Sequence, residues 1–160
     1  DQRLLLRYPM LMNMTMNYSR DNLMIKTHSA NIRVNSVEMI PEELTASSIY
    51  IVRDPRDVTI SYAHHMGIDI DTAIYRMNAV GCTLDNNDKG IIQTLGTWSV
   101  NVQTWHEDGL FPRTIVRYED LLANPEEELT AILNCLKLGK EEAEEVDPER
   151  VKKAIVGSSF

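Results

Sequence analysis

The sequence predicts an α/β fold, in which helices flank a mainly parallel sheet and residues 1–160 form a single domain. Two observations support this prediction. Apolar, β-favouring segments alternate with segments of helical character along the chain. Three of the predicted strands also end on charged or polar residues, at Lys26–His28, Arg53–Asp54 and Arg117–Asp120. Because ligands of parallel sheets bind at the carboxyl ends of the strands, we expect the functional site there.

The amino-acid composition is that of an ordinary globular protein and excludes some functions. Hydrophobic residues make up 43% and charged residues 25% of the chain, as in ordinary globular proteins. The net charge of −8 argues against a nucleic-acid binder but allows a local pocket for a small anion. Cys82 and Cys135 lack metal-ligand spacing, so we expect two reduced core thiols and no metal. No membrane segment or signal peptide is visible, which favours a cytoplasmic protein.

The first half of the chain contains the clearest strand. Leu23–Ser29 is a short apolar run that predicts a buried strand leading into a loop. Glu38–Ser47 predicts a turn with a short helical piece. Ser48–Asp54 is continuous and β-favouring over Ile49–Val52, which is typical of a central parallel strand with both faces covered.

Helices are predicted directly after that strand. Asp54 is a good N-cap and Pro55 suits the first helical turn. This helix should run to about His65 and end near Gly67. A second helix is predicted over residues 69–81, ending at a glycine.

The second half repeats the alternation. Ile91–His106 has apolar residues at mixed helical spacing and predicts a longer helix. Arg113–Asp120 predicts another strand that ends in charge. Asn124–Gly139 carries one apolar stripe and predicts an amphipathic helix, and Asp147–Gly157 predicts a last helix with an Asp-Pro start.

Arg53 and Ser61 suggest an anion site. Arg53 ends a strand beside the start of a helix, where N–H groups and partial positive charge favour anions. Its guanidinium is a planar fork that matches phosphate or sulfate oxygens, and the hydroxyl of Ser61 on the helix could add a donor. The alternative is that Arg53 pairs with Asp54 or Asp57 and Ser61 is an ordinary helix serine. For this segment alone, the alternative is favoured.

Lys26 and His28 suggest proton transfer. A histidine at the carboxyl edge of a sheet can act as a general base near neutral pH. Lys26, two residues earlier on a strand, would project to the same side and could stabilise developing charge. The alternative is a surface histidine and a solvated lysine. His64 and His65 diverge on a helix, so packing or surface exposure is favoured over a shared metal.

Taken together, these segments resemble the sulfotransferase family that uses 3′-phosphoadenosine 5′-phosphosulfate (PAPS). The segment IKTHSA resembles the family's strand end with the catalytic base, which implies His28 as the base and Lys26 as its helper. The segment IYIVRDPRDVTISYAHHM resembles the 3′-phosphate-binding segment. That likeness implies that Arg53 and Ser61, eight residues later, hold the 3′-phosphate.

Three further segments extend the resemblance. GTWSVNVQTWHE resembles a helix written Gly-Ser-Trp in many members, and IVRYEDLLANPEEELTAIL resembles the segment whose tyrosine, here Tyr118, lies by the adenine. The fold implied is a P-loop nucleotide-hydrolase-like sulfotransferase fold. The closing GSSF resembles a stretch that lines the adenine pocket, which implies that role for Ser158, Ser159 and Phe160.

Two motifs of the family are not found in the sequence. They are the phosphosulfate loop of the Pro-Lys-Ser-Gly-Thr type and the basic Arg-Lys-Gly segment. We therefore expect the chain to be an internal piece of a longer protein, and whether it is active alone stays open.

The function implied is transfer of a sulfuryl group from PAPS to a hydroxyl or amine of a small-molecule, glycan or lipid acceptor, without a metal. One alternative is a P-loop kinase-like phosphotransferase, which would carry a GxxxxGK[ST] loop that this sequence lacks. Another is a non-catalytic nucleotide-binding remnant. The sequence indicates neither the acceptor nor the oligomeric state.

Overall fold

The structure is a computed structural model that describes residues 7–17, 23–84, 92–107, 111–137 and 145–158. Contacts divide it into two compact units. The first unit comprises residues 1–44 and 54–107, and the second comprises residues 45–53 and 108–160. Each unit is described by itself, and the single domain over residues 1–160 stays a prediction.

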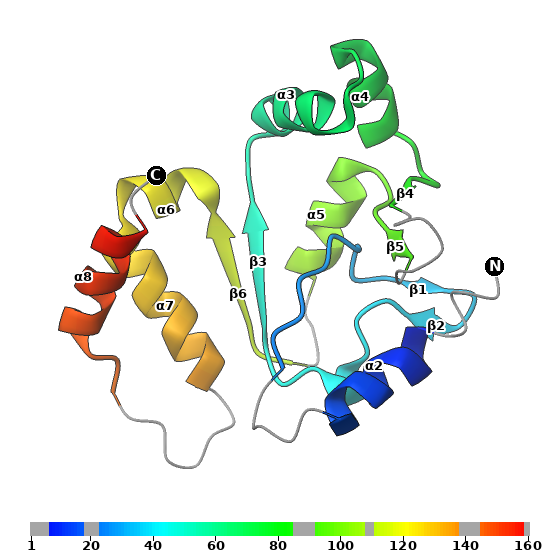
Figure 1. Ribbon diagram of the computed structural model, residues 1–160. Helices are drawn as coiled ribbons and strands as arrows, with labels where there is room; N and C mark the ends of the chain where they lie inside the picture. Colours follow the sequence, from blue (N-terminus) through cyan, green and yellow to red (C-terminus); the bar gives the residue numbers. More distant parts are fainter. Residues whose placement is uncertain (1–6, 18–22, 85–91, 108–110, 138–144, 159–160) are drawn as a thin grey trace. The chain divides into compact units, whose positions relative to one another are not determined.

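The second unit contains the predicted parallel sheet. Strands β3 (Ser48–Val52) and β6 (Arg113–Arg117) pair in parallel along their whole length. Helix α7 packs on both strands and α8 packs on α7, as Figure 1 shows. The arrangement confirms an α/β fold with a parallel sheet flanked by helices. The helices of this unit are α6 (Tyr118–Ala123), α7 (Pro125–Lys137) and α8 (Pro148–Gly157).

Strand β3 is less covered than the sequence predicts. Val116 on β6 is fully buried, but its register partner Ile51 is 55% exposed. In the described part of the chain each strand of this sheet has one neighbouring strand. Cys135 of α7 is buried against the pair, with its Sγ 3.6 Å from the carbonyl oxygen of Ser48. Burial also raises the pKa of the Tyr50 hydroxyl to about 12.

The first unit contains the helix that follows β3 in sequence. Helix α3 (Pro55–Met66) begins at the N-cap Asp54 and ends at Gly67, which has φ +62°. Its start and end confirm the prediction. Helix α4 (Ile70–Met77) packs on α3 and is shorter than the predicted helix over 69–81, because Asn78 already caps it.

The predicted helix over 91–106 is wrong in its first third. Residues Gln93–Thr94 form strand β5, which pairs antiparallel with β4 (Thr83–Leu84). The chain then turns through Gly96, with φ +65°, a conformation that favours glycine. Helix α5 (Trp98–His106) begins only after Thr97, whose Oγ1 accepts a hydrogen bond from the Val100 amide at 3.2 Å.

The remaining described elements of the first unit are one helix, two short strands and a 3-10 turn. They are α2 (Arg7–Asn17), the antiparallel strands β1 (Arg33–Val34) and β2 (Val37–Glu38), and the 3-10 turn η1 (Glu42–Leu44). The η1 turn confirms the predicted helical piece. The predicted strand over Leu23–Ser29 is wrong, because this segment lies in irregular backbone.

Candidate functional site

The backbone of His28 is held by two side chains from distant parts of the sequence. Its amide donates a hydrogen bond to Oε1 of Gln93 at 2.6 Å. Nδ2 of Asn101 donates to its carbonyl oxygen at 3.3 Å and to that of Leu95 at 3.0 Å. Both polar backbone groups of His28 are therefore satisfied by side chains of β5 and α5. This fixes the residue without strand pairing.

The residues that follow His28 are held in the same way. Nε1 of the buried Trp105 donates to the carbonyl oxygen of Ser29 at 3.1 Å, and the Ala30 amide donates to the carbonyl of Thr94 at 2.8 Å. The Trp105 side chain is part of the core. At the end of the predicted strand, the backbone of His28, Ser29 and Ala30 is thus bonded to β5 and α5.

His28 has the electrostatic character of a base. Partial burial, and then the positive charges of Lys26 and His65, lower the pKa of its imidazole below the ordinary value of 6.5. The imidazole is therefore neutral at pH 7 and can accept a proton. Lys26 is exposed and close enough for its charge to act on His28.

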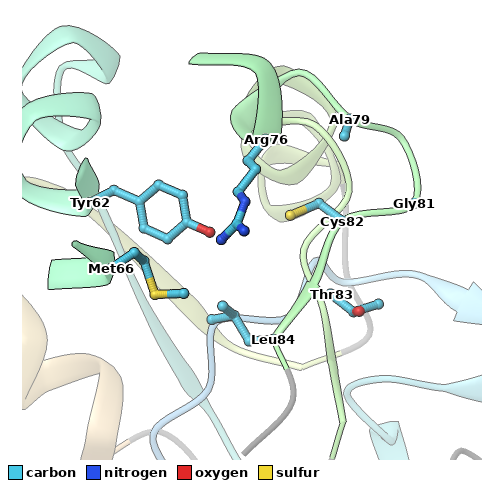
Figure 2. Close-up of a pocket in the computed structure, with 8 residues that line it drawn as sticks. All are labelled: Tyr62, Met66, Arg76, Ala79, Gly81, Cys82, Thr83 and Leu84. Atoms are coloured by element: carbon cyan, nitrogen blue, oxygen red, sulfur yellow. The ribbon is translucent and has the colours of Figure 1, made fainter. Parts of the chain in front are cut away.

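A cavity of about 440 Å³ lies between the end of α3 and the turn that follows α4. Figure 2 shows the hydroxyl of Tyr62 and the guanidinium of Arg76 pointing toward one another. Met66 and Leu84 line the same space. Burial raises the pKa of the Cys82 thiol, and the charge of Arg76 opposes that shift.

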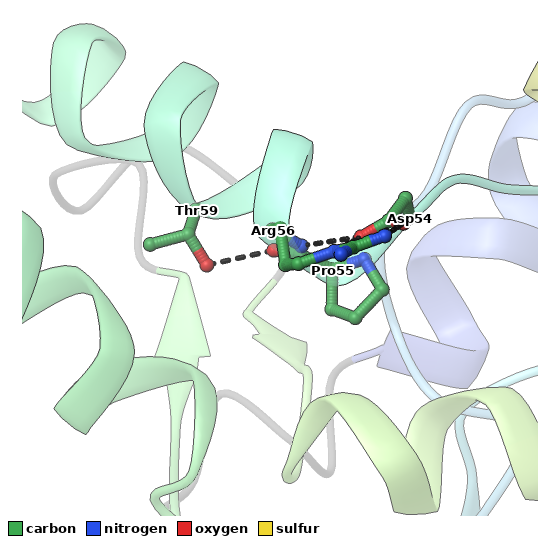
Figure 3. Close-up of polar contacts among 4 residues, drawn as sticks. All are labelled: Asp54, Pro55, Arg56 and Thr59. Atoms are coloured by element: carbon green, nitrogen blue, oxygen red, sulfur yellow. Dashed lines mark hydrogen bonds and ion pairs between the residues drawn. The ribbon is translucent and has the colours of Figure 1, made fainter.

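Side chains of α3 and of its N-cap bind the backbone of the first helical turn (Figure 3). Oδ1 of Asp54 accepts a hydrogen bond from the Arg56 amide at 2.9 Å, and the Arg56 side chain binds the same carboxylate through Nε and Nη2 at 2.9 and 2.5 Å. Thr59 Oγ1 donates to the carbonyl of Pro55 at 2.7 Å. Because the Asp54 carboxylate already occupies this helix start, an anion at the strand end would depend mainly on side chains.

Arg53 lies over the ring of Tyr118. Its Cζ is 4.7 Å from the ring centroid, which is cation–π distance. Each residue directly follows a strand of the parallel pair, and the last register pair is Val52 with Arg117. These two strand ends lie side by side because the strands are paired in parallel. Tyr118 begins helix α6, however, so the strand predicted over 113–120 ends at Arg117.

The predicted site residues are divided between the two units. Ser61 is exposed on α3 and belongs to the first unit, as do Lys26 and His28, whereas Arg53 and Tyr118 belong to the second. Ser158 is exposed at the end of α8, where its Oγ donates to the carbonyl of Ile155 at 3.3 Å. The positions of Ser159 and Phe160 lie outside the described residues.

Sequence reasoning missed several residues that support the site. Gln93 is 65 positions from His28, so no local pattern could connect them. Asn101 lies in the segment GTWSVNVQTWHE, four residues before Trp105 and on the same face of α5. His65 was assigned to packing or surface, although its charge acts on His28.

Within the described ranges, no three histidine, cysteine or acidic side chains gather in a way that could hold a metal ion. Both cysteines are free thiols. None of the helices in the described part of the chain is long and apolar enough to cross a membrane.

Comparison with known families gives one clear match. The family model of the sulfotransferase domain matches residues 2–156 of the 160-residue chain. No curated protein sequence matches the chain significantly. The match covers the His28 segment, both strands of the parallel pair and the helices around them. The chain therefore belongs to the sulfotransferase domain family.

Proposed function

We propose that this protein transfers a sulfuryl group from PAPS to a hydroxyl or amine of an acceptor, with His28 as the general base. Membership of the sulfotransferase domain family supports the class of reaction. The environment of His28 supports its assignment as the base. Its backbone is held on both sides, and the pKa of its imidazole is lowered, which keeps the ring ready to accept a proton.

Arg53 and Tyr118 support an adenine nucleotide with an extra phosphate as the donor. The guanidinium offers charge-assisted hydrogen bonds to phosphate oxygens, and the ring beside it offers an apolar surface for a base. Ser61 would add a hydroxyl donor to the same 3′-phosphate. We assign the adenine side of the site to Tyr118 together with Ser158, Ser159 and Phe160. These residue types fit PAPS.

PAPS, when bound, would supply the sulfuryl group, and adenosine 3′,5′-bisphosphate would leave. An imidazole nitrogen of His28 accepts the proton of the attacking hydroxyl or amine as the new bond to sulfur forms and the bond from sulfur to the leaving phosphate oxygen breaks. Lys26 offsets negative charge near the transferring group. This chemistry depends on positioning and charge stabilisation, and it requires no metal.

The acceptor in this proposal is a small molecule, a glycan or a lipid. The cytoplasmic location expected from the sequence stays a prediction.

The proposal is tested with sulfur-radiolabelled PAPS, the full-length protein and a panel of hydroxyl and amine acceptors. His28→Asn should lower kcat by at least about 100-fold, because general-base catalysis supplies roughly that factor. Binding of adenosine 3′,5′-bisphosphate should be unchanged in this variant. His64→Asn is the matched control, since His64 neighbours His65 on α3 and is not among the causes of the His28 pKa shift. An unchanged kcat in His28→Asn removes the base assignment, and failure to transfer label to any acceptor removes the reaction.

A further inference from the structure

The cavity beside α3 has one polar end and an apolar wall. Tyr62 and Met66 reach it from α3, Arg76 reaches it from the last turn of α4, and Leu84 reaches it from β4. In Figure 2 the Tyr62 hydroxyl faces the Arg76 guanidinium, while the Met66 and Leu84 side chains lie on the same side of that polar pair. The turn after α4 closes the wall, with the Cys82 amide donating to the carbonyl of Ala79 at 3.0 Å.

Arg76 has no ion-pair partner among the described residues, unlike three other arginines. Other arginines of the protein pair with carboxylates: Arg33 with Glu38, Arg56 with Asp54 and Arg117 with Asp120. Within the described residues, the half-buried guanidinium of Arg76 forms no ion pair or hydrogen bond. Taking a cation partly out of water without a partner costs free energy, so this group favours an anion that enters the cavity.

The residues that line the cavity also favour an anionic ligand. None of the described residues that line the cavity is acidic: they are Tyr62, Met66, Arg76, Ala79, Gly81, Cys82, Thr83 and Leu84. Cys82 supplies no thiolate at neutral pH, because burial raises the pKa of its thiol. These described lining residues therefore present one positive charge to a ligand, together with thioether and aliphatic surface.

The cavity lies at the C-terminal end of α3, where His65 is also located. Tyr62 and Met66 are four residues apart and share one face of the helix. His65 lies in the same turn, and its positive charge lowers the pKa of His28. All of these residues belong to the first unit, as does Arg76.

We propose that this cavity binds the acceptor of the sulfuryl transfer, and that Arg76 selects acceptors in which an anionic group accompanies an apolar body. The proposal rests on the proposed function, because an acceptor site has meaning only if His28 removes the acceptor's proton. A cavity of about 440 Å³ is at the small end of ligand sites. It suits a hydroxylated aromatic or short aliphatic acid, and it is too small for an oligosaccharide.

The test uses three probes that share a phenol and differ in charge: para-hydroxyphenylacetate, its methyl ester and tyramine. With full-length protein and PAPS, kcat/KM should fall in the order acid, ester, amine. Arg76→Gln should raise KM for the acid by about tenfold, the loss of one charge-assisted contact, and leave KM for the ester unchanged. Arg76→Lys keeps the charge and should keep the order. Arg150→Gln, which removes an exposed guanidinium on α8, is the matched control.

Calorimetry separates this proposal from the proposed function. The three probes are titrated into protein without PAPS, so that the readout does not depend on turnover. A preference for the acid that disappears in Arg76→Gln supports the site even if no label is transferred, in which case only the proposed function fails. Equal binding of the three probes, binding of none of them, or an unchanged order in Arg76→Gln overturns the proposal.

Discussion

The guanidinium of Arg53 lies 4.7 Å from the centroid of the Tyr118 ring, and the two residues come from the ends of two parallel strands in register. The contact is a consequence of the sheet. Val52 and Arg117 are paired, so the residues that follow them leave the same edge side by side. A cation and an aromatic ring are thereby placed together by the β3–β6 pairing, at the edge where ligands of parallel sheets bind.

Removing the ring should weaken nucleotide binding. Tyr118→Leu is expected to raise the Kd for adenosine 3′,5′-bisphosphate about fivefold, because a cation–π contact contributes about 1 kcal/mol. Tyr118→Phe keeps the ring and should bind as the wild type does. Calorimetry measures both. If Phe weakens binding as much as Leu does, the hydroxyl matters and the cation–π contact does not.

Gln93 should act as a positioning residue for His28. Gln93→Leu removes the acceptor of the His28 amide and should lower kcat with little change in bisphosphate affinity. Gln93→Glu retains an oxygen acceptor and should restore most of the activity. Steady-state kinetics separates kcat from KM in the two variants. Equal losses in the two variants would contradict this role, because glutamate keeps both the shape of the side chain and the acceptor oxygen.

The titration of His28 should respond to His65 and not to His64. The pKa of His28 is below 6.5 in the folded protein, so as the proposed base it would act down to a lower pH than an ordinary histidine. His65→Gln removes a positive charge that disfavours protonation. The acidic limb of kcat/KM, and the NMR titration of the His28 ring, should therefore move to higher pH. His64→Gln should leave both where they are, and a shift of equal size in the two variants would contradict the assignment.

Gly67 should matter for stability through its backbone alone. Its φ is +62°, and a Cβ built there would meet nothing within 4 Å. Gly67→Ala is expected to lower the free energy of unfolding by about 1 kcal/mol, because a residue with a Cβ is strained in that conformation. Gly81→Ala is the control, since a Cβ there also meets nothing and its φ is not in the left-handed region. The free energy of unfolding is measured by urea denaturation. An equal loss in Gly67→Ala and Gly81→Ala would contradict the role of the backbone conformation.

Local signals predicted much of the fold. The Asp-Pro start and glycine end of α3, the β-favouring run of β3 and the amphipathic pattern of α7 all depend on residues within one turn or strand. The meeting of Arg53 and Tyr118 followed from parallel pairing, which alternation of strands and helices already indicated.

The errors arose where distant contacts decide local structure. The apolar run before His28 looks like a strand, but the backbone that follows it, from His28 to Ala30, binds Gln93, Thr94, Asn101 and Trp105. The run before α5 has helical spacing, yet pairing with β4 and the turn at Gly96 prevent a helix there. The hairpin turn at Asn35 and Ser36, both with positive φ, lacks the glycine that usually marks such turns.

The central claim is that this protein holds a nucleotide 3′-phosphate through Arg53 and Ser61. The most direct test is calorimetry of full-length protein with adenosine 3′,5′-bisphosphate and with adenosine 5′-monophosphate, which differ only in that phosphate. We expect the bisphosphate to bind at least about tenfold more tightly. Arg53→Gln should abolish the difference, and Ser61→Ala should reduce it. Equal affinity for the two nucleotides in the wild type, or an undiminished difference in Arg53→Gln, would contradict the claim.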